Sequence, residues 1–206
     1  MATTNSATKK KPAVRAADAD GTEQRLLREA AHLFRKQGFA GTSTRELAAA
    51  VGLQSASLYH YMESKEDLLY AICVSGNQLM IDAVTKAIEG REPIEALYAA
   101  IRAHLTTAIE NRDVYLTTLA EVKSLSPRRR REVQKTRQGY AEVLAGVVER
   151  AQEAGDIRTD ISADHLMLVL RNLLSWTLFW FRTDGDLSIE QFADLGSKVF
   201  LEGARA

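Results

Sequence analysis

Three consecutive ring side chains, Tyr59, His60 and Tyr61, form the most concentrated group in the sequence with chemistry suited to binding. Two serines precede them and Lys65 follows. Three neighbouring rings cannot all point into one core, so some of them face solvent. Small polar residues followed by amphipathic rings suit the major groove of DNA, where rings contact thymine methyl groups or hydrogen-bond to phosphates. An ordinary amphipathic surface is the alternative interpretation.

The four histidines show none of the spacings that identify a catalytic or metal site. His32, His60, His104 and His165 form no His-Glu-x-x-His motif, and no Ser-His-Asp or Cys-His arrangement is recognisable. The sequence also lacks a glycine-rich phosphate loop. The single cysteine, Cys73, lies in the apolar run LLYAICV, which predicts a buried, unreactive thiol. We therefore expect no enzyme, no metal site and no cofactor.

Composition predicts a helical protein with a substantial hydrophobic core. The 206 residues are 46% hydrophobic with a formal net charge of zero, and only 3 of them are proline. Long stretches rich in Ala, Leu, Glu, Arg and Gln favour helices over strands. The apolar run 166–181 is interrupted by Arg171 and Asn172 and is shorter than the roughly 20 residues of a membrane span. With one cysteine and no signal-peptide-like start, these features predict a soluble cytoplasmic protein without a membrane segment.

Helix-starting and helix-ending signals divide the N-terminal third. Residues 1–21 lack apolar periodicity and predict a disordered basic arm, which either follows a DNA groove or stays solvated. Gly38 suits the end of a first helix, and Ser43 with Glu46 forms a capping box for a second. Ser64 with Asp67 restarts the chain as a long helix. The predicted helices are 22–37, 43–51, 54–62 and 64–89.

Two short helices around a glycine-containing turn, supported by a longer helix, describe a helix-turn-helix unit. On the helix 54–62, Leu58 and Met62 lie four residues apart and are expected to face the core. Ser55, Ala56, Tyr59 and His60 then occupy the opposite, outward side. Lys65 lies in the first turn of the next helix, where backbone N–H groups favour a phosphate.

The pattern stays helical beyond residue 70. Pro93 and Pro127 suit first helical positions, Gly90 and Gly155 suit helix ends, and Ser188 with Gln191 forms another capping box. The candidate helices are 93–110, 112–124, 127–154, 162–182 and 188–204. The sequence therefore predicts an all-α protein in three parts: the arm 1–21, a three-helix DNA-binding domain 22–68, and a helical-bundle domain 69–206.

The stretch LFRKQGFAGTSTRELAAAVGLQSASLYHYMESKEDLL resembles the DNA-binding domain of the TetR family of bacterial regulators over residues 22–70. Several linked elements occur in the family's order and spacing, which makes the resemblance specific. It implies a dimer that binds a palindromic operator. Phosphate contacts are implied for Thr44, Ser57, Tyr59 and Lys65, and base contacts for Arg45, Gln54, Ser55, Ala56 and His60. Gln54 stands where the family often has a serine cap, and Met62 replaces the usual Phe.

The resemblance also implies that the final two helices, 162–182 and 188–204, pair across a two-fold axis. The first is apolar nearly all round, and the second carries an apolar stripe that includes Phe192, Gly196 and Val199. The alternative is that both helices complete the core of a monomer. A dimer would place two recognition helices about one DNA turn apart on a palindrome.

The C-terminal stretch LRNLLSWTLFWFRTDGDLSIEQ resembles TetR-like regulators of lipid, steroid and fatty-acid breakdown, which often respond to acyl-CoA thioesters. Arg171 on an apolar helix calls for an anionic partner, either Glu121, Asp164 or a ligand phosphate. The run Arg128–Arg131 is either a solvated face or a clamp for CoA phosphates. The candidate ligand-binding residues, each of which also suits a plain core, are Tyr98, Arg102, Tyr115, Glu121, Met167, Arg171, Trp176, Phe179 and Trp180.

These resemblances imply a transcriptional repressor that a small hydrophobic or acyl-CoA-type ligand releases from its operator. The alternatives are a regulator of efflux genes that senses cationic or aromatic drugs, and an activator. A helical interaction protein without DNA contact is a third class, which a salt-dependent shift of palindromic DNA would exclude.

Overall fold

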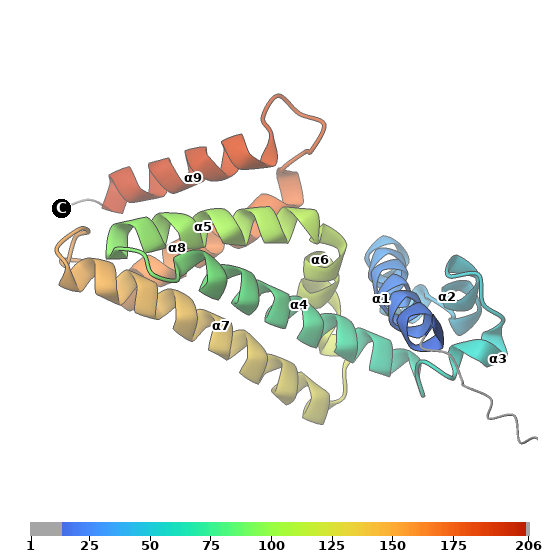
Figure 1. Ribbon diagram of the computed structural model, residues 1–206. Coiled ribbons are helices and arrows are strands. Elements are labelled where there is room, and N and C mark those ends of the chain that lie inside the picture. The colour runs from blue at the N-terminus through green and yellow to red at the C-terminus, as the bar shows by residue number, and fades with distance from the viewer. Residues whose placement is uncertain (1–13, 205–206) are drawn as a thin grey trace, which may run out of the picture.

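The computed structural model describes residues 14–204, and every regular element within that range is a helix. Helices α1 (Val14–Gly41), α2 (Thr44–Ala50) and α3 (Ser55–Leu58) lie together at one end of the molecule (Figure 1). Helix α4 (Lys65–Ile88) leads from them into a bundle. The bundle helices are α5 (Pro93–Glu110), α6 (Arg112–Glu121), the 3₁₀ helix η1 (Val122–Ser124), α7 (Pro127–Glu153), α8 (Ala163–Trp180) and α9 (Ile189–Ala204). The predicted all-α class is confirmed.

Capping residues fix most helix ends where the sequence predicted them. The Ser43 side chain accepts from the Glu46 backbone N–H at 3.2 Å, while Glu46 accepts from the Ser43 backbone N–H at 2.8 Å. Ser64 and Asp67 form the same reciprocal arrangement at the start of α4. Such boxes satisfy N–H groups that have no partner inside the helix. Gly38 interrupts α1 with φ +79°, a conformation that residues with a Cβ rarely adopt.

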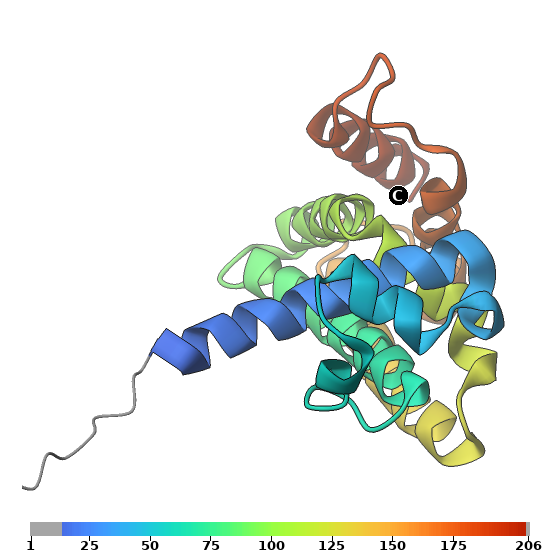
Figure 2. The ribbon, with the colours of Figure 1, turned by 90° about the vertical axis from the view of Figure 1, so that its right-hand side faces the viewer.

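The prediction of a disordered arm over residues 1–21 is wrong for its last part. Helix α1 begins at Val14 instead of Thr22, and its first turns project away from the bundle (Figure 2). Residues 14–21 contain three alanines, which favour helix, and extending an existing helix requires no new nucleation. Residues 1–13, with Lys9, Lys10 and Lys11, lie outside the described range.

Helix α3, in contrast, is shorter than predicted: it ends at Leu58 instead of Met62. Its N-cap residue, Gln54, makes no side-chain capping bond. After Leu58 the hydrogen bonds join residues three apart, as in a 3₁₀ turn. The His60 N–H donates to the Ser57 carbonyl at 3.2 Å and the Tyr61 N–H to the Leu58 carbonyl at 2.9 Å. The rings therefore lie on hydrogen-bonded turns and not on a regular α-helix.

Two buried clusters form the core, and α4 belongs to both. The first joins α1, α2 and α3 to the start of α4 and also includes Leu125 and Val133 from the bundle side. The second fills the space among α4, α5, α7, α8 and α9. The predicted boundary at residue 68/69 therefore falls inside a continuous helix. Helix α4 is therefore a continuous connection between the bundle and the helix-turn-helix unit.

Helix α4 would pass as a membrane span by length and composition alone. It lies among α1, α5, α6 and α7, and Leu69, Ile72, Cys73 and Val84 are fully buried there. The central helix of a bundle passes the same test, so this is weak evidence for a span. Burial also raises the pKa of the Cys73 thiol to about 11, as expected for an unreactive cysteine.

Gly76 lies where α4 meets α6. A Cβ at this position would lie 2.7 Å from Val114 Cγ1. We expect Gly76→Ala to lower the free energy of unfolding by roughly 1–3 kcal/mol, because overpacking outweighs the better helix propensity of alanine. Gly139→Ala in α7 is the matched control, since its nearest atom, Ile81 Cδ1, is 3.9 Å away. Urea unfolding should rank Gly139→Ala above wild type and Gly76→Ala below it, and the reverse order would contradict the close contact between Gly76 and Val114.

Candidate nucleic-acid interface and ligand cavity

The outer face of the helix-turn-helix unit presents the residues predicted to meet DNA. Leu58 and Met62 are buried as expected, and the Tyr59 side chain is 56% exposed. The remaining exposed residues of this face are Gln54, Ser55, Ala56 and His60. Small residues at the start of α3 leave room for the backbone to approach a groove, with the rings at its C-terminal edge.

Arg45 extends this face from α2. It is exposed and makes no ion pair with the residues that the structure describes. Its guanidinium is therefore available for a bidentate contact with guanine. Thr44 on α2 and Ser57 on α3, which are expected to contact phosphates, are half-buried.

Lys65 is already bound within the protein. Its ammonium donates to the carbonyls of Phe39 at 2.7 Å and Thr42 at 2.8 Å, and lies 4.4 Å from the centre of the Phe39 ring. Phe39 lies in the last turn of α1, after Gly38, and Thr42 lies in the connection to α2. Lys65 thus stabilises this connection in the structure, a role that the sequence did not indicate.

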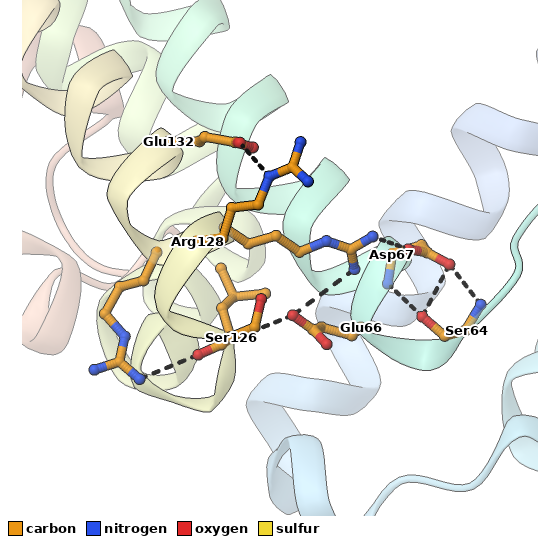
Figure 3. A network of polar contacts seen from close by, with 9 residues as sticks. Ser64, Glu66, Asp67, Ser126, Arg128 and Glu132 are labelled. Carbon is orange, nitrogen blue, oxygen red and sulfur yellow. Dashed lines mark hydrogen bonds and ion pairs between the residues drawn. The ribbon is translucent and has the colours of Figure 1, made fainter.

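A polar network joins the start of α4 to the start of α7 (Figure 3). Glu66 accepts from the Ser126 backbone N–H at 2.8 Å, and Arg129 forms an ion pair with Asp67. Although burial acts in the opposite direction, hydrogen bonds from Arg129 and Ser64 lower the pKa of Asp67. The carboxylate that caps α4 is therefore also the one that holds α7.

Helix α6 provides a second connection to the helix-turn-helix unit. Asp113 accepts from Arg35 at 2.5 Å and contacts His32 at 2.8 Å, so it links α6 to α1. The buried Thr117 hydroxyl donates to the Ala31 carbonyl at 2.8 Å. Helices α6 and α7 therefore hold the DNA-facing unit against the bundle.

A cavity of about 480 Å³ lies among α4, α5, α6, α7 and α8. Its inner wall is mostly buried and apolar, whereas its outer edge is exposed and polar. The inner residues include Met80, His104, Ala108, Tyr140 and Leu178, and the outer ones include Arg130, Gln134, Arg137, Gln138 and Arg171. Such a shape accommodates an amphipathic molecule with its apolar part inside.

Three arginines lie at the edge of this cavity, and no carboxylate lines it. Arg137 and Arg171 make no ion pair with the described residues, so neither Glu121 nor Asp164 meets Arg171 as the sequence suggested. Arg130 donates to the carbonyls of Lys123 at 2.7 Å and Leu125 at 3.1 Å. The electrostatic environment therefore favours a negatively charged group at the entrance.

The Arg128–Arg131 run does not form one positive surface. Arg128 pairs with Glu132 at 3.2 Å, and Arg129 pairs with Asp67 of α4. Arg130 alone among the four lines the cavity, and Arg131 is exposed away from it. Successive residues on a helix point in different directions, which divides a continuous sequence run among separate sites.

Two buried polar side chains, His104 on α5 and Tyr140 on α7, meet at the inner end of the cavity. His104 Nδ1 and the Tyr140 hydroxyl are hydrogen-bonded, and the two ring centroids are 5.6 Å apart. Burial lowers the pKa of His104 to about 4 and raises the pKa of Tyr140 well above its usual value. Both side chains are therefore neutral near pH 7.

The structure brings only two of the nine predicted ligand residues, Tyr115 and Arg171, to this cavity. Glu121 faces Gly38 and accepts from Ser124 at 3.0 Å. Met167 is part of the solid core. Tyr98 and Arg102 turn toward α9, where both contact Asp194. These positions do not line this cavity, because a helix pattern gives the side of one helix and not the neighbour it meets.

Trp176, Phe179 and Trp180 do not line this cavity but lie at the protein surface. They are 67%, 54% and 56% exposed and lie on the outer face of α8. An apolar groove of about 910 Å³ runs between α8 and α9, over α5. The exposed apolar residues of α8 and α9 are Leu168, Val169, Leu173, Trp176, Phe179, Trp180, Leu195 and Val199. We call this set the α8–α9 face.

Gly196 and Phe192 contact the protein's own bundle. A Cβ on Gly196 would lie 3.3 Å from Leu105 Cδ1 of α5. The Phe192 ring lies 4.8 Å from that of Phe181 and 5.3 Å from that of Trp180. The apolar stripe predicted for the last helix therefore divides between the core and the exposed α8–α9 face.

The sequence did not indicate His104, Tyr140 and Arg137 as cavity residues, whereas Arg130 belongs to the run considered as a clamp for CoA phosphates. One sequence signal could have found the buried pair: a polar residue among the core positions of an apolar helix. His104 is such a residue in α5. Among the described residues, no group of three or more His, Cys, Asp or Glu side chains is placed to hold a metal ion.

Comparison with known proteins is consistent with this architecture. Residues 26–72 match the model for bacterial regulatory proteins of the tetR family, and residues 90–204 match the model for the tetracyclin repressor-like C-terminal domain. The HTH-type transcriptional repressor KstR2 of Rhodococcus jostii is 28% identical over 192 residues, which cover 89% of this chain and 91% of that protein.

Two solved structures are also similar. The TetR family transcriptional regulator PfmR from Thermus thermophilus has a TM-score of 0.80 at 35% identity, covering 86% of this chain and 97% of that one. AibR in complex with isovaleryl coenzyme A and operator DNA has a TM-score of 0.77 at 28% identity, with the same coverages of 86% and 97%. These relatives and family models describe regulators, which confirms that the chain is not an enzyme. The chain belongs to the TetR family of bacterial transcriptional regulators.

Proposed function

We propose that this protein is a cytoplasmic repressor that binds a palindromic operator as a homodimer and is released by an acyl-CoA thioester. The observation that carries the inducer assignment is the cavity: an apolar interior of about 480 Å³ with three arginines at its entrance and no carboxylate in its lining. An acyl chain suits the interior, and the phosphates of CoA suit Arg137 and Arg171.

A cationic drug is the less favoured inducer. Sensing a buried cation calls for an acidic group among the aromatic residues, and no Asp or Glu lines this cavity. Glu121, the strongest acidic candidate from the sequence, contacts Ser124 elsewhere. The similar protein AibR was solved with isovaleryl coenzyme A and operator DNA, and KstR2 is named a repressor. The first description supports a CoA thioester in preference to a drug, and the second supports repression in preference to activation.

The proposed dimer forms through the α8–α9 face. Large exposed apolar patches are uncommon on monomeric proteins and mark interaction sites. Helices α8 and α9 supply such a patch, with Trp176 67% and Val199 62% exposed. A second copy related by a two-fold axis would cover it symmetrically. Two helix-turn-helix units would then face two half-sites of a palindrome.

Release follows from the position of the cavity between the two helices that hold the DNA-facing unit. Helix α6 binds α1 through Asp113, and α7 binds α4 through Arg129. A ligand that separates α6 from α7 therefore displaces both connections together. The continuous α4 then changes the spacing of the two recognition segments. By linkage, such a ligand must bind the DNA-bound conformation more weakly than the free one.

The inducer assignment is tested by calorimetry with a panel of acyl-CoAs. We expect at least one to bind below about 100 µM and to weaken the complex with an operator chosen by binding-site selection at least tenfold. Arg137→Ala and Arg171→Ala should each weaken ligand binding about five- to tenfold, because each removes a charge-assisted hydrogen bond. Arg131→Ala, which removes an exposed arginine outside the cavity, is the matched control. If no CoA thioester binds, or if all bind without loosening the complex, the assignment fails.

Arg45 and Tyr59 should affect DNA binding in different ways. Arg45→Ala is expected to cost about 1–3 kcal/mol at its preferred base and to relax selection there, because its guanidinium reads base edges. Tyr59→Ala should weaken binding to all sequences alike, because a phosphate contact carries no sequence information. Binding-site selection with both variants checks this. An unchanged consensus for Arg45→Ala, or a shifted one for Tyr59→Ala, would contradict the assigned roles.

A further inference from the structure

We propose that the His104–Tyr140 pair selects inducers that carry an oxygen acceptor on the part buried in the cavity. Both residues line the inner end of the cavity, and each is at least nine-tenths buried. The acceptor is either the thioester carbonyl or an oxygen further along the acyl chain. The inference rests on the proposed function, because it concerns the specificity of the same cavity.

Counting protons shows that the pair has one donor to spare. A neutral imidazole carries one proton on nitrogen, and a neutral phenol carries one on oxygen. The bond between His104 Nδ1 and the Tyr140 hydroxyl uses one of these two protons. If the hydroxyl donates, His104 Nε2–H remains; if Nδ1–H donates, the Tyr140 hydroxyl proton remains. Either tautomer therefore leaves one proton donor at the inner end of the cavity.

Three other polar side chains of the inner wall are already paired within the protein. The Tyr115 hydroxyl donates to the Gly76 carbonyl at 2.9 Å, and the Thr118 hydroxyl to the Val114 carbonyl at 2.8 Å. The Asn77 amide donates to the Thr136 hydroxyl at 2.8 Å. Ser175 lies half-buried on the same wall and provides a control position. The inner wall thus offers two candidate donors, the His104–Tyr140 pair and the less buried Ser175 hydroxyl, and a Ser175 variant distinguishes them.

A spare donor discriminates between ligands because a hydrogen-bonding group left unpaired in a closed site is costly. In the free protein, water can accept this hydrogen bond. A ligand with an oxygen at the same place replaces that water without loss. A purely apolar chain displaces the water and offers no acceptor, which lowers its affinity about tenfold or more.

The experiment compares three ligands that share the CoA part. Hexanoyl-CoA has the thioester carbonyl, S-hexyl-CoA is a thioether without it, and a third compound is S-hexyl-CoA with a ketone near the end of the chain. Calorimetry on wild type should show at least one oxygenated ligand binding about tenfold more tightly than S-hexyl-CoA. The compound that gains affinity identifies which oxygen accepts the hydrogen bond from the pair.

Variants connect this preference to the pair. The double variant His104→Leu with Tyr140→Phe has no donor, so its three affinities should agree within about twofold. Replacing both partners of a buried hydrogen bond by apolar groups is commonly well tolerated, so the variant is expected to fold. Ser175→Ala should keep the wild-type preference. Equal affinities in wild type, or a preference that survives the double variant or disappears in Ser175→Ala, would overturn the proposal.

A second probe separates this inference from the acyl-CoA assignment. If no CoA compound binds, the proposed inducer is wrong, but the cavity can still be tested with cyclohexanone and cyclohexene by ligand-observed NMR. Wild type should bind cyclohexanone more tightly, and the double variant should bind both equally. Equal binding by wild type would overturn the role of the pair, whatever the natural inducer is.

Discussion

Trp176→Glu should turn the protein into a monomer and reduce its operator affinity at least about 100-fold. The Trp176 side chain is 67% exposed on the α8–α9 face, so the substitution does not disturb the core of the subunit. In the proposed dimer it would bury two unpaired charges near the two-fold axis, which is strongly unfavourable. A monomer contacts only one half-site of the operator at a time, so its affinity for the whole operator is lower. Analytical ultracentrifugation at micromolar concentration and an operator-binding titration measure both effects.

Leu79→Glu is the matched control, because Leu79 is a 42% exposed apolar residue on α4, outside the α8–α9 face. It should leave both the dimer and operator binding intact. Trp176 is a better probe than Phe192, which is half-buried against Trp180 and Phe181 of its own chain. A Trp176→Glu protein that still sediments as a dimer and binds operator would place the interface elsewhere.

His104 should make the protein less stable as the pH falls below about 6.5. Its pKa is about 4 in the folded state, against an ordinary value of 6.5. Between these values the unfolded state binds the proton and the folded state does not, so acid favours unfolding. The loss is about 2 kcal/mol from pH 8 to pH 5, and approaches about 3 kcal/mol near pH 4. Urea unfolding at a series of pH values measures it.

The window between pH 5 and 6.5 isolates His104 from the carboxylates. Hydrogen bonds from Ser126 lower the pKa of Glu66, and those from Arg129 and Ser64 outweigh burial to lower that of Asp67. Their stabilising effect is therefore lost only at more acidic pH. His104→Leu should flatten the profile in this window, whereas His165→Leu, at an exposed position, should not. An unchanged slope in His104→Leu would show that another group is responsible.

Local signals explain why the helix-turn-helix unit was predicted well. Ser43 with Glu46 and Ser64 with Asp67 fix two helix starts through contacts only three residues apart. Leu58 and Met62 are buried because their spacing places both on one side. The sequence did not predict the early end of α3. That end depends on an uncapped Gln54 and on the ring-rich turns that follow.

Most residues that line the proposed ligand cavity were not recognised in the sequence, because its walls come from five helices. Arg171 was recognised because an arginine on an apolar helix stands out in the sequence. His104 and Tyr140, 36 residues apart, meet only when α5 packs against α7. Trp176, Phe179 and Trp180 look like core or pocket residues in any sequence pattern. Only the packing of α8 against α5 and α7 shows that they face outward.

By itself, the sequence determined the all-α class, most helix boundaries, the outward face of the DNA-binding unit and the family. Capping and periodicity act within one or two helical turns, so a linear pattern contains them. The tertiary structure alone decided that Arg129 ties α7 to α4, that Lys65 binds carbonyls, and which polar groups share the cavity. These depend on which faces of distant helices meet, and a pattern along one helix does not specify its neighbour.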